Sequence, residues 1–518
     1  MLRKIRTALA IIFFAVITLL FLDFTGTLHA WLGWMAKIQF LPAVLAINAG
    51  VVIFLVLLTL IFGRLYCSVI CPLGIFQDLV SWINGRRSRK ARMRFTYSPA
   101  KNWLRYGMLV LFIAALLAGI GSFAALLDPY SAYGRIASNL FAPLWQWGSN
   151  LLAFFAERID SYAFYKTEVW LRSLPTFIIA AVTFIVIAVL AWKNGRTWCN
   201  TICPVGTVLG FISRFSLFKV RIDAEKCKSC SLCTRACKAS CIDYKNHSID
   251  HSRCVDCFDC LDTCTHGAIG WTFRFRGKSG KTVTAEDPAG TNTAAADLSR
   301  RRFLATGAAL TAAATIKAQE KKVDGGLAVI EDKEIPDRQT KIVPAGALSL
   351  KNFYQHCTAC QLCVSVCPNQ VLRPSAGLDT LMQPEMSYER GYCRPECTKC
   401  SEVCPAGAIK PVSAEEKSSI RIGHAVWVKE NCIPLTDGVK CGNCARHCPT
   451  GAIQMVPFRG RHRYRGGRED NTGNDSPEIR IPVINTERCI GCGACENLCP
   501  ARPFTAIYVE GNMVHGEI

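Results

Sequence analysis

The chain has 518 residues, of which half are hydrophobic and 19% are charged, and its formal net charge is +21. This length allows several domains, and the balance predicts a membrane protein with water-soluble parts. The 29 cysteines fall in tight groups that mostly end in Cys-Pro, whereas secreted disulfide frameworks are short and scatter their cysteines. The composition therefore argues against a disulfide scaffold and predicts metal ligation.

The basic charge does not indicate a nucleic-acid partner, although a basic surface can neutralise phosphates. Much of the excess lies in short runs such as residues 85–94, which a membrane protein uses for orientation. Bound clusters would lower the charge further, because four thiolates around a [4Fe-4S] core leave an oxidised site about two units negative. We expect no nucleic-acid binding.

Four segments are apolar and long enough to span a bilayer, which takes about 20 residues. They are residues 7–24, 42–62, 103–127 and 174–192. Lys and Arg crowd the N-terminus, the loop after the second segment and the stretch after the fourth, so the positive-inside rule places these in the cytoplasm. Residues 1–215 are expected to form an α-helical, multi-pass domain of four helices in the inner (cytoplasmic) membrane, in contact with lipids.

The same short motif follows the second and fourth segments, as GRLYCSVICPLG at residues 63–74 and GRTWCNTICPVG at residues 195–206. Both copies return to the same face, so a parallel two-fold repeat is expected. Cysteines at i and i+4 share one face of a helix. The motif thiols can therefore converge as redox-active groups or as ligands of a further metal or cluster; they are Cys67, Cys71, Cys199 and Cys203. Structural turns with merely buried cysteines are the alternative.

Residues 216–272 carry two cysteine runs with the spacing of a two-cluster bacterial ferredoxin, and we expect them in the cytoplasm. In that pattern three cysteines of a run bind one [4Fe-4S] cube and the fourth crosses to the other. The predicted ligand sets are Cys227, Cys230, Cys233 and Cys264 for one cube, and Cys254, Cys257, Cys260 and Cys237 for the other. Zinc is the competing metal, but its structural sites seldom use paired runs of this spacing.

Three residues of this segment depart from the ferredoxin pattern. Lys238 and His266 lie at or just after the places where Pro usually follows the fourth cysteine, and Cys241 is a ninth thiol without an obvious role. We expect Cys241 to be a spare buried thiol, and His266 to be a neighbour of the cluster and not a ligand.

Residues 273–345 form a predicted linker rich in Gly, Thr, Ala, Lys and Asp. Within it lies a twin-arginine-like export signal at residues 299–318, which begins SRRRFLATGAAL and has Arg300 and Arg301 as its pair. Its apolar core is shorter than an ordinary spanning helix. The signal predicts that the following domain is periplasmic or otherwise extracytoplasmic. The alternative is a basic helix start followed by a surface helix.

Residues 346–518 hold sixteen cysteines in four sets, which predict four [4Fe-4S] clusters and therefore six in the chain. In chain order the sets are Cys357, Cys360, Cys363 and Cys367; Cys393, Cys397, Cys400 and Cys404; Cys432, Cys441, Cys444 and Cys448; and Cys489, Cys492, Cys495 and Cys499. Either neighbouring sets exchange their fourth cysteines, or the outer two sets pair around the inner two. The shared regularity of the outer sets favours this nested pairing, which requires Cys367 to lie with the last set.

Between the last two sets, the loop FRGRHRYRGGR at residues 458–468 concentrates arginines. It is either a solvated insertion or a docking surface for an acidic redox partner, whose encounter rate a basic surface would raise.

The order of these parts resembles a fusion of two quinol-dehydrogenase subunits that serve periplasmic nitrate reductase systems. Residues 1–270 resemble the NapH-type membrane ferredoxin, and residues 299–518 resemble the NapG-type four-cluster ferredoxin with a twin-arginine leader. The resemblance implies bacterial-ferredoxin-like α+β domains and electron transfer between the quinone pool and a redox protein such as a reductase or cytochrome. It identifies no quinone-binding residue, no terminal acceptor and no direction of electron flow.

No nucleophile, base and orienting group of the kind that hydrolysis requires is evident, so we expect an electron-transfer component of an oxidoreductase. Two other functions stay open. A metal-handling or assembly factor could use the membrane-adjacent thiols. Alternatively, the whole soluble part could be cytoplasmic and connect a ferredoxin pool to the membrane.

Overall fold

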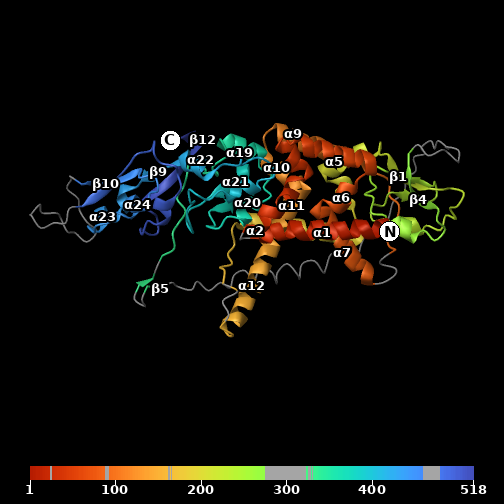
Figure 1. Ribbon diagram of the computed structural model, residues 1–518, viewed down its shortest axis with the longest axis horizontal. Helices are drawn as coiled ribbons and strands as arrows, with labels where there is room; N and C mark the ends of the chain where they lie inside the picture. The colour runs from red at the N-terminus through yellow and green to blue at the C-terminus, as the bar shows by residue number, and fades with distance from the viewer. Residues whose placement is uncertain are drawn as a thin grey trace, which may run out of the picture.

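The computed structural model describes residues 1–23, 26–87, 93–160, 164, 166–274, 323–324, 328–329, 331–458 and 479–518. The molecule is elongated, with a bundle of helices in the middle, a first ferredoxin domain within residues 218–274 at one end, and a C-terminal domain within residues 331–518 at the other (Figure 1). The predicted export signal with Arg300 and Arg301, and most of the arginine-rich loop, lie outside the described residues.

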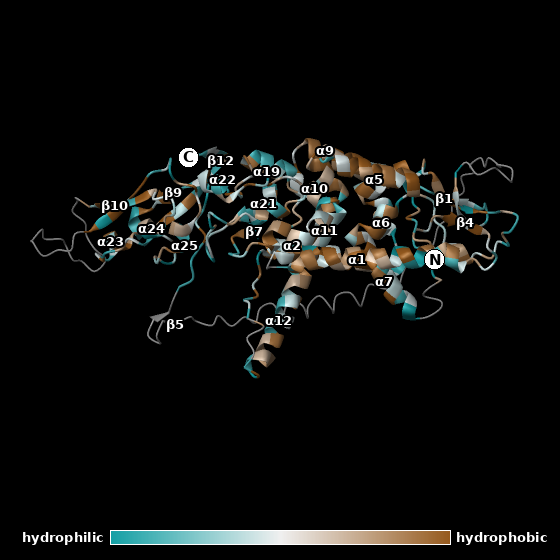
Figure 2. Ribbon diagram, viewed as in Figure 1, coloured by the Kyte–Doolittle hydropathy of each residue, from teal (hydrophilic) through white to brown (hydrophobic). Residues whose placement is uncertain are grey.

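The bundle is built from the apolar segments of the first 213 residues. Its elements are α1 (Leu2–Leu22), α2 (Thr27–Leu32), α3 (Trp34–Lys37), α4 (Phe40–Leu45), α5 (Ala49–Phe62), α6 (Leu65–Val69), α7 (Pro72–Arg87), α9 (Asn102–Leu117), α10 (Gly121–Leu127), α11 (Pro129–Ile136), the π-helix η1 (Ala137–Phe141), α12 (Ala142–Glu157), α13 (Leu174–Asn194), α14 (Thr197–Thr201) and α15 (Pro204–Ser213). The helices α1, α5 and α9 are apolar, as their brown ribbon shows (Figure 2), and many of their large apolar side chains are exposed on the outside of the bundle.

Two of the four predicted spans are single long helices, and two are broken. α1 and α13 have 21 residues each and are long and apolar enough to cross a membrane. The segment 42–62 is interrupted between α4 and α5, where Ile47 has a left-handed backbone (φ 54°) and Asn48 caps α5. The segment 103–127 is interrupted between α9 and α10, beside Gly119 (φ 75°). Hydropathy averages over such turn residues, so the sequence did not indicate the breaks.

The segment after α10, which the sequence indicates only as a connection between spans, is helical through α11, η1 and α12. Asp128 Oδ2 accepts a hydrogen bond from Ser131 N–H at 2.8 Å and caps α11, with Pro129 at the first position. Every residue of α11 is buried, and this helix packs against α7 and α13. α12 then leaves the bundle and projects to one side (Figure 1). A connection therefore supplies part of the centre of the bundle.

Both cysteine-rich regions consist of short antiparallel strand pairs and short helices. The first ferredoxin domain has β1 (Phe218–Ile222), α16 (Leu232–Ala236), β2 (Ile242–Asp243), β3 (Ser248–Ile249), α17 (Asp259–Thr263) and β4 (Ile269–Phe273). The C-terminal domain has α19 (Leu350–His356), α20 (Leu362–Ser365), β7 (Leu372–Pro374), η2 (Leu378–Thr380), β8 (Pro384–Met386), α21 (Lys399–Val403), α22 (Ala414–Ser419), β9 (Ile420–Trp427), η3 (Lys429–Asn431), α23 (Ile433–Thr436), α24 (Asn443–Arg446), β10 (Ile453–Pro457), β11 (Arg480–Ile484), α25 (Ala494–Asn497) and β12 (Ile507–Glu517); β5 (Val323–Asp324) and β6 (Ala328–Val329) precede it. The pairs are β1–β4, β2–β3, β5–β6, β7–β8, β9–β12 and β10–β11.

Candidate iron–sulfur sites

The first ferredoxin domain gathers its cysteines around two small cavities. One, here called the outer site, is lined by Cys227, Cys230, Cys233 and Cys264; the other, the inner site, is lined by Cys237, Cys254, Cys257 and Cys260. Helices α16 and α17 pack on each other, and Cys237 and Cys264 follow directly after them. Each fourth cysteine therefore reaches the cavity of the other run, which is the grouping predicted for two [4Fe-4S] cubes.

The backbone around the second cysteine of each regular run has an unusual shape. The residues immediately before and after it have positive φ angles; these pairs are Ser229 and Ser231, Asp256 and Phe258, Ala359 and Gln361, and Gly491 and Gly493. Non-glycine residues in this region cost about 1–3 kcal/mol each unless their surroundings impose the conformation. The turns aim N–H groups at sulfur, as where Ala359 N–H donates to Cys357 Sγ at 3.4 Å. A cluster at the centre would impose this shape.

In the C-terminal domain the first two sets exchange their fourth cysteines. One cavity, site B, is lined by Cys367, Cys393, Cys397 and Cys400. Burial raises the pKa of Cys363, and negative charge on Cys360, Cys357 and Cys404 raises it further, because these thiols are its neighbours. Site A is therefore formed by Cys357, Cys360, Cys363 and Cys404.

The last two sets exchange in the same way. Burial raises the pKa of Cys444 to about 11, and the neighbouring thiols that add to this shift are Cys441, Cys432 and Cys499. Burial likewise raises the pKa of Cys492 to about 12, with further contributions from Cys489 and Cys448. Site C is therefore formed by Cys432, Cys441, Cys444 and Cys499, and site D by Cys448, Cys489, Cys492 and Cys495.

The nested pairing favoured by the spacing is therefore wrong. Cys367 lies with Cys393 and not with Cys489, because α20 packs on α21 and α24 packs on α25. The helices that carry the third cysteines thus pair in chain order: α16 with α17, α20 with α21, and α24 with α25. Whether the cysteines of a set are regularly spaced or stretched depends on the local loop around that site. The spacing does not identify the other set with which the fourth cysteine is exchanged.

The four C-terminal sites form a row that leads away from the bundle. A charge on Cys400 acts on the pKa of Cys363, which places site B next to site A. Cys393 N–H donates to Cys492 O at 2.9 Å and joins site B to site D. Cys444 acts on the pKa of Cys495 and joins site D to site C. Figure 1 shows α20 and α21 beside the bundle and α24 farther out, and Figure 2 shows α25 in the same outer part as α24.

Site A lies directly on the bundle. A Cβ atom on Gly134 of α11 would lie 2.3 Å from Cys360 O, so only glycine permits this approach. Beside it, Asn139 Nδ2 donates to Gln361 Oε1 at 2.8 Å. The row of sites A, B, D and C therefore starts at the surface of the helices.

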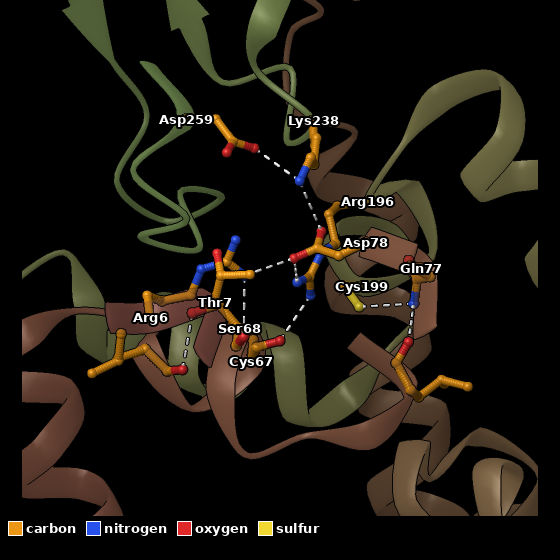
Figure 3. A network of polar contacts seen from close by, with 12 residues as sticks. Arg6, Thr7, Cys67, Ser68, Gln77, Asp78, Arg196, Cys199, Lys238 and Asp259 are labelled. Atoms are coloured by element: carbon orange, nitrogen blue, oxygen red, sulfur yellow. Dashed lines mark hydrogen bonds and ion pairs between the residues drawn. The ribbon is translucent and has the colours of Figure 1, made fainter. Parts of the chain in front are cut away.

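The inner site faces the opposite end of the bundle. Lys238 Nζ lies 2.8 Å from Asp259 Oδ2 and 3.6 Å from Asp78 Oδ1. Asp78 Oδ2 also lies 2.8 Å from Arg196 Nη2 and 2.9 Å from Arg6 Nη1 (Figure 3). The departure from proline at Lys238 is explained by this bridge, because the ammonium links a residue beside the inner site to α7.

Cys241 is buried, as expected, and it contacts two of the ligand positions. Its Sγ lies 3.6 Å from Cys237 Sγ, it hydrogen-bonds to Cys254, and it lines the inner site as a fifth sulfur. The sequence showed the thiol but not its contact with two ligand positions, which depends on how the chain turns after α16. His266 lies exposed at the rim of the outer site, a place that agrees with its expected role as a neighbour.

The four thiols of the repeated motif lie together inside the bundle, and all are buried; they are Cys67, Cys71, Cys199 and Cys203. Among the described residues, no three His, Cys, Asp or Glu side chains converge as the ligands of one metal ion would. This holds for the ferredoxin sets as well as for the motif thiols.

Comparison with protein families supports iron–sulfur binding. A family described as "4Fe-4S binding domain" matches residues 45–90 and 174–223, and two described as "4Fe-4S dicluster domain" match residues 438–502 and 250–371. The first match contains both copies of the repeated motif. The last joins two cysteine runs that the structure places at opposite ends of the bundle (Figure 1). Together with the cavities, these matches define an iron–sulfur protein with several ferredoxin-type domains.

Individual relatives extend this class assignment. The chain is 30% identical over 180 residues to the methylamine utilization ferredoxin-type protein MauM of Methylophilus methylotrophus, which covers 34% of this chain and 72% of MauM. It is 26% identical over 235 residues to the ferredoxin-type protein NapH of Haemophilus influenzae, covering 44% of this chain and 68% of NapH. It is 24% identical over 228 residues to the putative electron transport protein YccM of Escherichia coli, covering 43% of this chain and 55% of YccM. The chain belongs to the family of ferredoxin-type polyferredoxins. No solved structure matches it.

Proposed function

We propose that this protein is a membrane-bound relay that passes single electrons between the quinone pool and a redox protein on the outer side of the cytoplasmic membrane. One observation carries the proposal: the predicted cluster sites lie at opposite ends of an apolar helical bundle, four of them in a row (Figure 1). Each [4Fe-4S] cube carries one electron, so such a row needs no substrate pocket.

The surface of the bundle supports a membrane location. In the most apolar 18-residue windows of α1 and α13, only 28% and 22% are buried inside the protein. A helix in the core of a soluble protein would be largely buried, whereas lipid would cover these faces. Large exposed apolar side chains continue on α5 and α9, such as Phe54 and Leu111.

We infer four crossings, made by α1, α4–α5, α9–α10 and α13. Broken helices are tolerated in a membrane where protein packs around the break. Contacts between the two motif copies support a parallel two-fold repeat: Arg64 Nη2 donates to Cys199 O at 3.3 Å, and Arg196 Nη1 donates to Cys67 O at 2.8 Å. Each arginine reaches the first cysteine of the other copy.

The distribution of charge supports the orientation. Arg3 pairs with Asp259 at 2.9 Å, so the basic N-terminus lies at the end that carries the first ferredoxin domain. The positive-inside rule places this end in the cytoplasm. Strand β4, the last strand of this ferredoxin domain, lies at the same end of the bundle, and the C-terminal domain lies at the other end (Figure 1). With this orientation the C-terminal domain would have to be exported, which is the role we propose for the twin-arginine-like signal at residues 299–318.

The projecting helix α12 is suited to a position at the outer surface of the cytoplasmic membrane. It carries exposed apolar side chains along its length, including Trp145 and Trp147, and it leaves the bundle sideways at the end nearest the C-terminal domain (Figure 1). Tryptophans gather at membrane–water interfaces, where amphipathic helices lie in the plane of the membrane.

These features support the finer proposal of a NapH-like membrane half joined to a NapG-like exported half. The relay would then be a quinol-dehydrogenase-like component of an anaerobic respiratory chain. Its partners would be the quinone pool and a reductase or cytochrome that accepts electrons at the outer face.

The test uses the full-length protein in spheroplasts and in isolated membranes. We expect protease added to intact spheroplasts to release the C-terminal domain, and added quinol to bleach the visible absorbance of its clusters anaerobically. Protection of this domain until the cells are lysed would contradict the proposal and favour a cytoplasmic connector. Colourless, zinc-containing protein would contradict the iron–sulfur assignment itself.

A further inference from the structure

A cavity of about 290 Å³ lies between the bundle and the C-terminal domain. The bundle contributes the start of α13 and the residues before it, including Arg172 and Leu174, and the C-terminal domain contributes β7, β8 and residues around Ile335 and Lys341. This volume is near the lower limit of pockets that hold small molecules, roughly 300 Å³. No cysteine is among the described residues that line the cavity, so it is separate from the predicted cluster sites.

The β7–β8 pair separates this cavity from site B. Arg373 lies directly opposite Glu385 in the strand register, and Leu372 lies opposite Met386. Because side chains alternate between the two faces of a strand, these cross-strand pairs point to opposite faces. Leu372 and Met386 line site B, Arg373 and Glu385 line the cavity, and Met386 also reaches it. A molecule in the cavity would therefore lie one strand pair away from the predicted cluster at site B.

Buried polar atoms without a partner converge on the cavity. Ser387 is 5% exposed and Arg373 is 9% exposed, and neither Ser387 Oγ nor Arg373 Nε has a hydrogen-bond partner among the described residues. Ser387 N–H donates to Val371 O at 2.9 Å, so the strand pairing continues past β8 and places the Ser387 side chain on the same face as Glu385. A buried donor that stays unsatisfied is costly. A ligand with hydrogen-bond acceptors would satisfy both donors.

Three of the four cations that line the described part of the cavity have carboxylate partners. The pairs are Arg373 with Glu389 at 2.6 Å, Lys341 with Glu385 at 3.1 Å, and Arg338 with Glu496. The fourth cation, Arg172, lies beside site B: burial lowers its pKa, and negative charge on Cys367 opposes this shift. The lining therefore lacks the excess of positive charge that would select a phosphate group, and it favours a neutral ligand.

The cavity lies where the chain enters α13, one of the inferred membrane crossings. Leu174 is the first residue of α13 and is 58% exposed, and Ile335, which also lines the cavity, is 52% exposed. Lipid would cover exposed apolar side chains at this level. A ligand with an apolar tail could keep the tail in the membrane while its polar head lies against β7 and β8.

We propose that this cavity binds the ring of a quinol or quinone from the membrane, with Ser387 Oγ and Arg373 Nε donating hydrogen bonds to its oxygens, and exchanges electrons with site B. The proposal rests on the relay proposed above and assigns its quinone site. A quinone ring is neutral, has two oxygens that accept hydrogen bonds, and carries an apolar tail. It therefore matches the donors, the charge balance and the position of the cavity.

The reaction at this site converts quinol to quinone. Both O–H bonds of the quinol break, and its two electrons leave one at a time, each reducing one ferric iron at site B to ferrous iron. The redox protein at the outer face accepts each electron through the row of sites, so that site B is oxidised again before the second transfer. The two protons go in turn to the carboxylate of Glu385, whose side chain is 30% exposed and can release each of them to water.

The first test narrows the cavity in the full-length protein, purified anaerobically in detergent. Ala376 lies exposed at the edge of the cavity. In Ala376→Trp, a soluble short-chain quinol should bleach the clusters about tenfold more slowly or worse, because the indole occupies the space of the ring. Dithionite should bleach this variant as completely as the wild type. Leu378→Trp is the matched control, because Leu378 is 86% exposed and does not line the cavity.

The second test removes one donor and locates the ligand directly. Ser387→Ala should raise the quinol concentration at half-maximal bleaching rate about threefold to tenfold, the loss expected for one hydrogen bond. Ser418→Ala on the exposed side of α22 is its control and should behave as the wild type. In the wild type, an azido-quinone should label residues within 331–342 or 372–387 on illumination, and unlabelled quinone should prevent the labelling.

Wild-type bleaching in both Ala376→Trp and Ser387→Ala, with label found only elsewhere in the chain, would overturn this site and leave the relay standing. Displacement of the label by phosphatidylglycerol but not by quinone would identify a lipid site and would also overturn the proposal. If quinol did not bleach the wild type at all, the relay itself would be contradicted, and this site with it.

Discussion

The two iron–sulfur regions share the same cysteine-run geometry but meet the bundle through different chemistry. The first ferredoxin domain is held by buried charges, with Lys238 reaching Asp78. The C-terminal domain is held by close backbone approach, with Gly134 against Cys360 O. Buried charges must be satisfied by partners, which makes that joint sensitive to the loss of one ion. A glycine contact depends on shape and is sensitive to added volume. The contact of the first ferredoxin domain with the bundle is therefore weakened by removing a charge, whereas the contact of the C-terminal domain is weakened by adding side-chain volume.

The largest expected effect is the loss of a whole cluster. It tests whether the C-terminal domain, like the first ferredoxin domain, exchanges its fourth cysteines between neighbouring runs. Cys367→Ser and Cys393→Ser should remove the same cluster signal and about four iron atoms each, because both line site B. Cys489→Ser should remove a different signal. If Cys367→Ser instead removed the same cluster signal as Cys489→Ser, the nested pairing would be correct.

Breaking the charged joint should destabilise the protein strongly. Asp78→Ala leaves Arg196, Arg6 and Lys238 without their shared carboxylate. The free energy of unfolding is expected to fall by about 3–5 kcal/mol, because the remaining cations are buried. Thermal loss of cluster absorbance in detergent measures it. Asp262→Ala removes an exposed partner of Arg3 and serves as the control, with a loss below about 1 kcal/mol.

Breaking the close-packed joint should have a smaller effect that is confined to the C-terminal domain. In Gly134→Ala the new methyl group meets Cys360 O and the ring of Phe21. We expect about 1–3 kcal/mol of destabilisation and faster proteolytic release of the C-terminal domain. Gly148→Ala on α12 meets no atom within 4 Å and is the matched control. Equal release rates in the two variants would contradict the close contact.

The fifth sulfur of the inner site distinguishes the first ferredoxin domain from the C-terminal one. Cys241→Ala removes a hydrogen bond to the positions of Cys237 and Cys254, so the midpoint potential of one cluster should fall by tens of millivolts. Cys241→Ser keeps a donor and should recover most of the potential. Redox titration followed by electron paramagnetic resonance measures both. Loss of iron in either variant would instead identify Cys241 as a ligand.

The smallest effect concerns pH and only the C-terminal domain. His515 in β12 is largely buried, its ring has no hydrogen-bond partner among the described residues, and burial lowers its pKa to about 4. The unfolded chain has a histidine pKa of about 6.5, so it binds a proton that the folded state excludes between these values. The free energy of unfolding should fall as pH drops through this window, by at most about 1.4 kcal/mol per unit. In His515→Phe the urea concentration at the midpoint of unfolding should depend less on pH across this window. An unchanged dependence on pH would contradict the assignment to His515.

Much of the site could be predicted because cysteine spacing is a local property. In a two-cluster ferredoxin the first three cysteines of a run bind one cube and the fourth lies beside the other cube. This spacing predicts that Cys237 groups with the second run, and the structure has that grouping. The pairing of Cys367 could not be predicted in this way, since it depends on which helices pack together. The contacts of Cys241 could not be predicted for the same reason, because they are made by a turn and not by a spacing.

The amino-acid sequence by itself determined the iron–sulfur class, the apolar character of the bundle and the repeated motif, because these depend on residue type and on intervals of a few residues. Only the tertiary structure decided that α4–α5 and α9–α10 are broken, that α11 lies inside the bundle, and that sites A, B, D and C form a row. It also decided that Arg64 and Arg196 cross between the motif copies. These features depend on contacts between residues far apart in the chain, which neither composition nor local periodicity records.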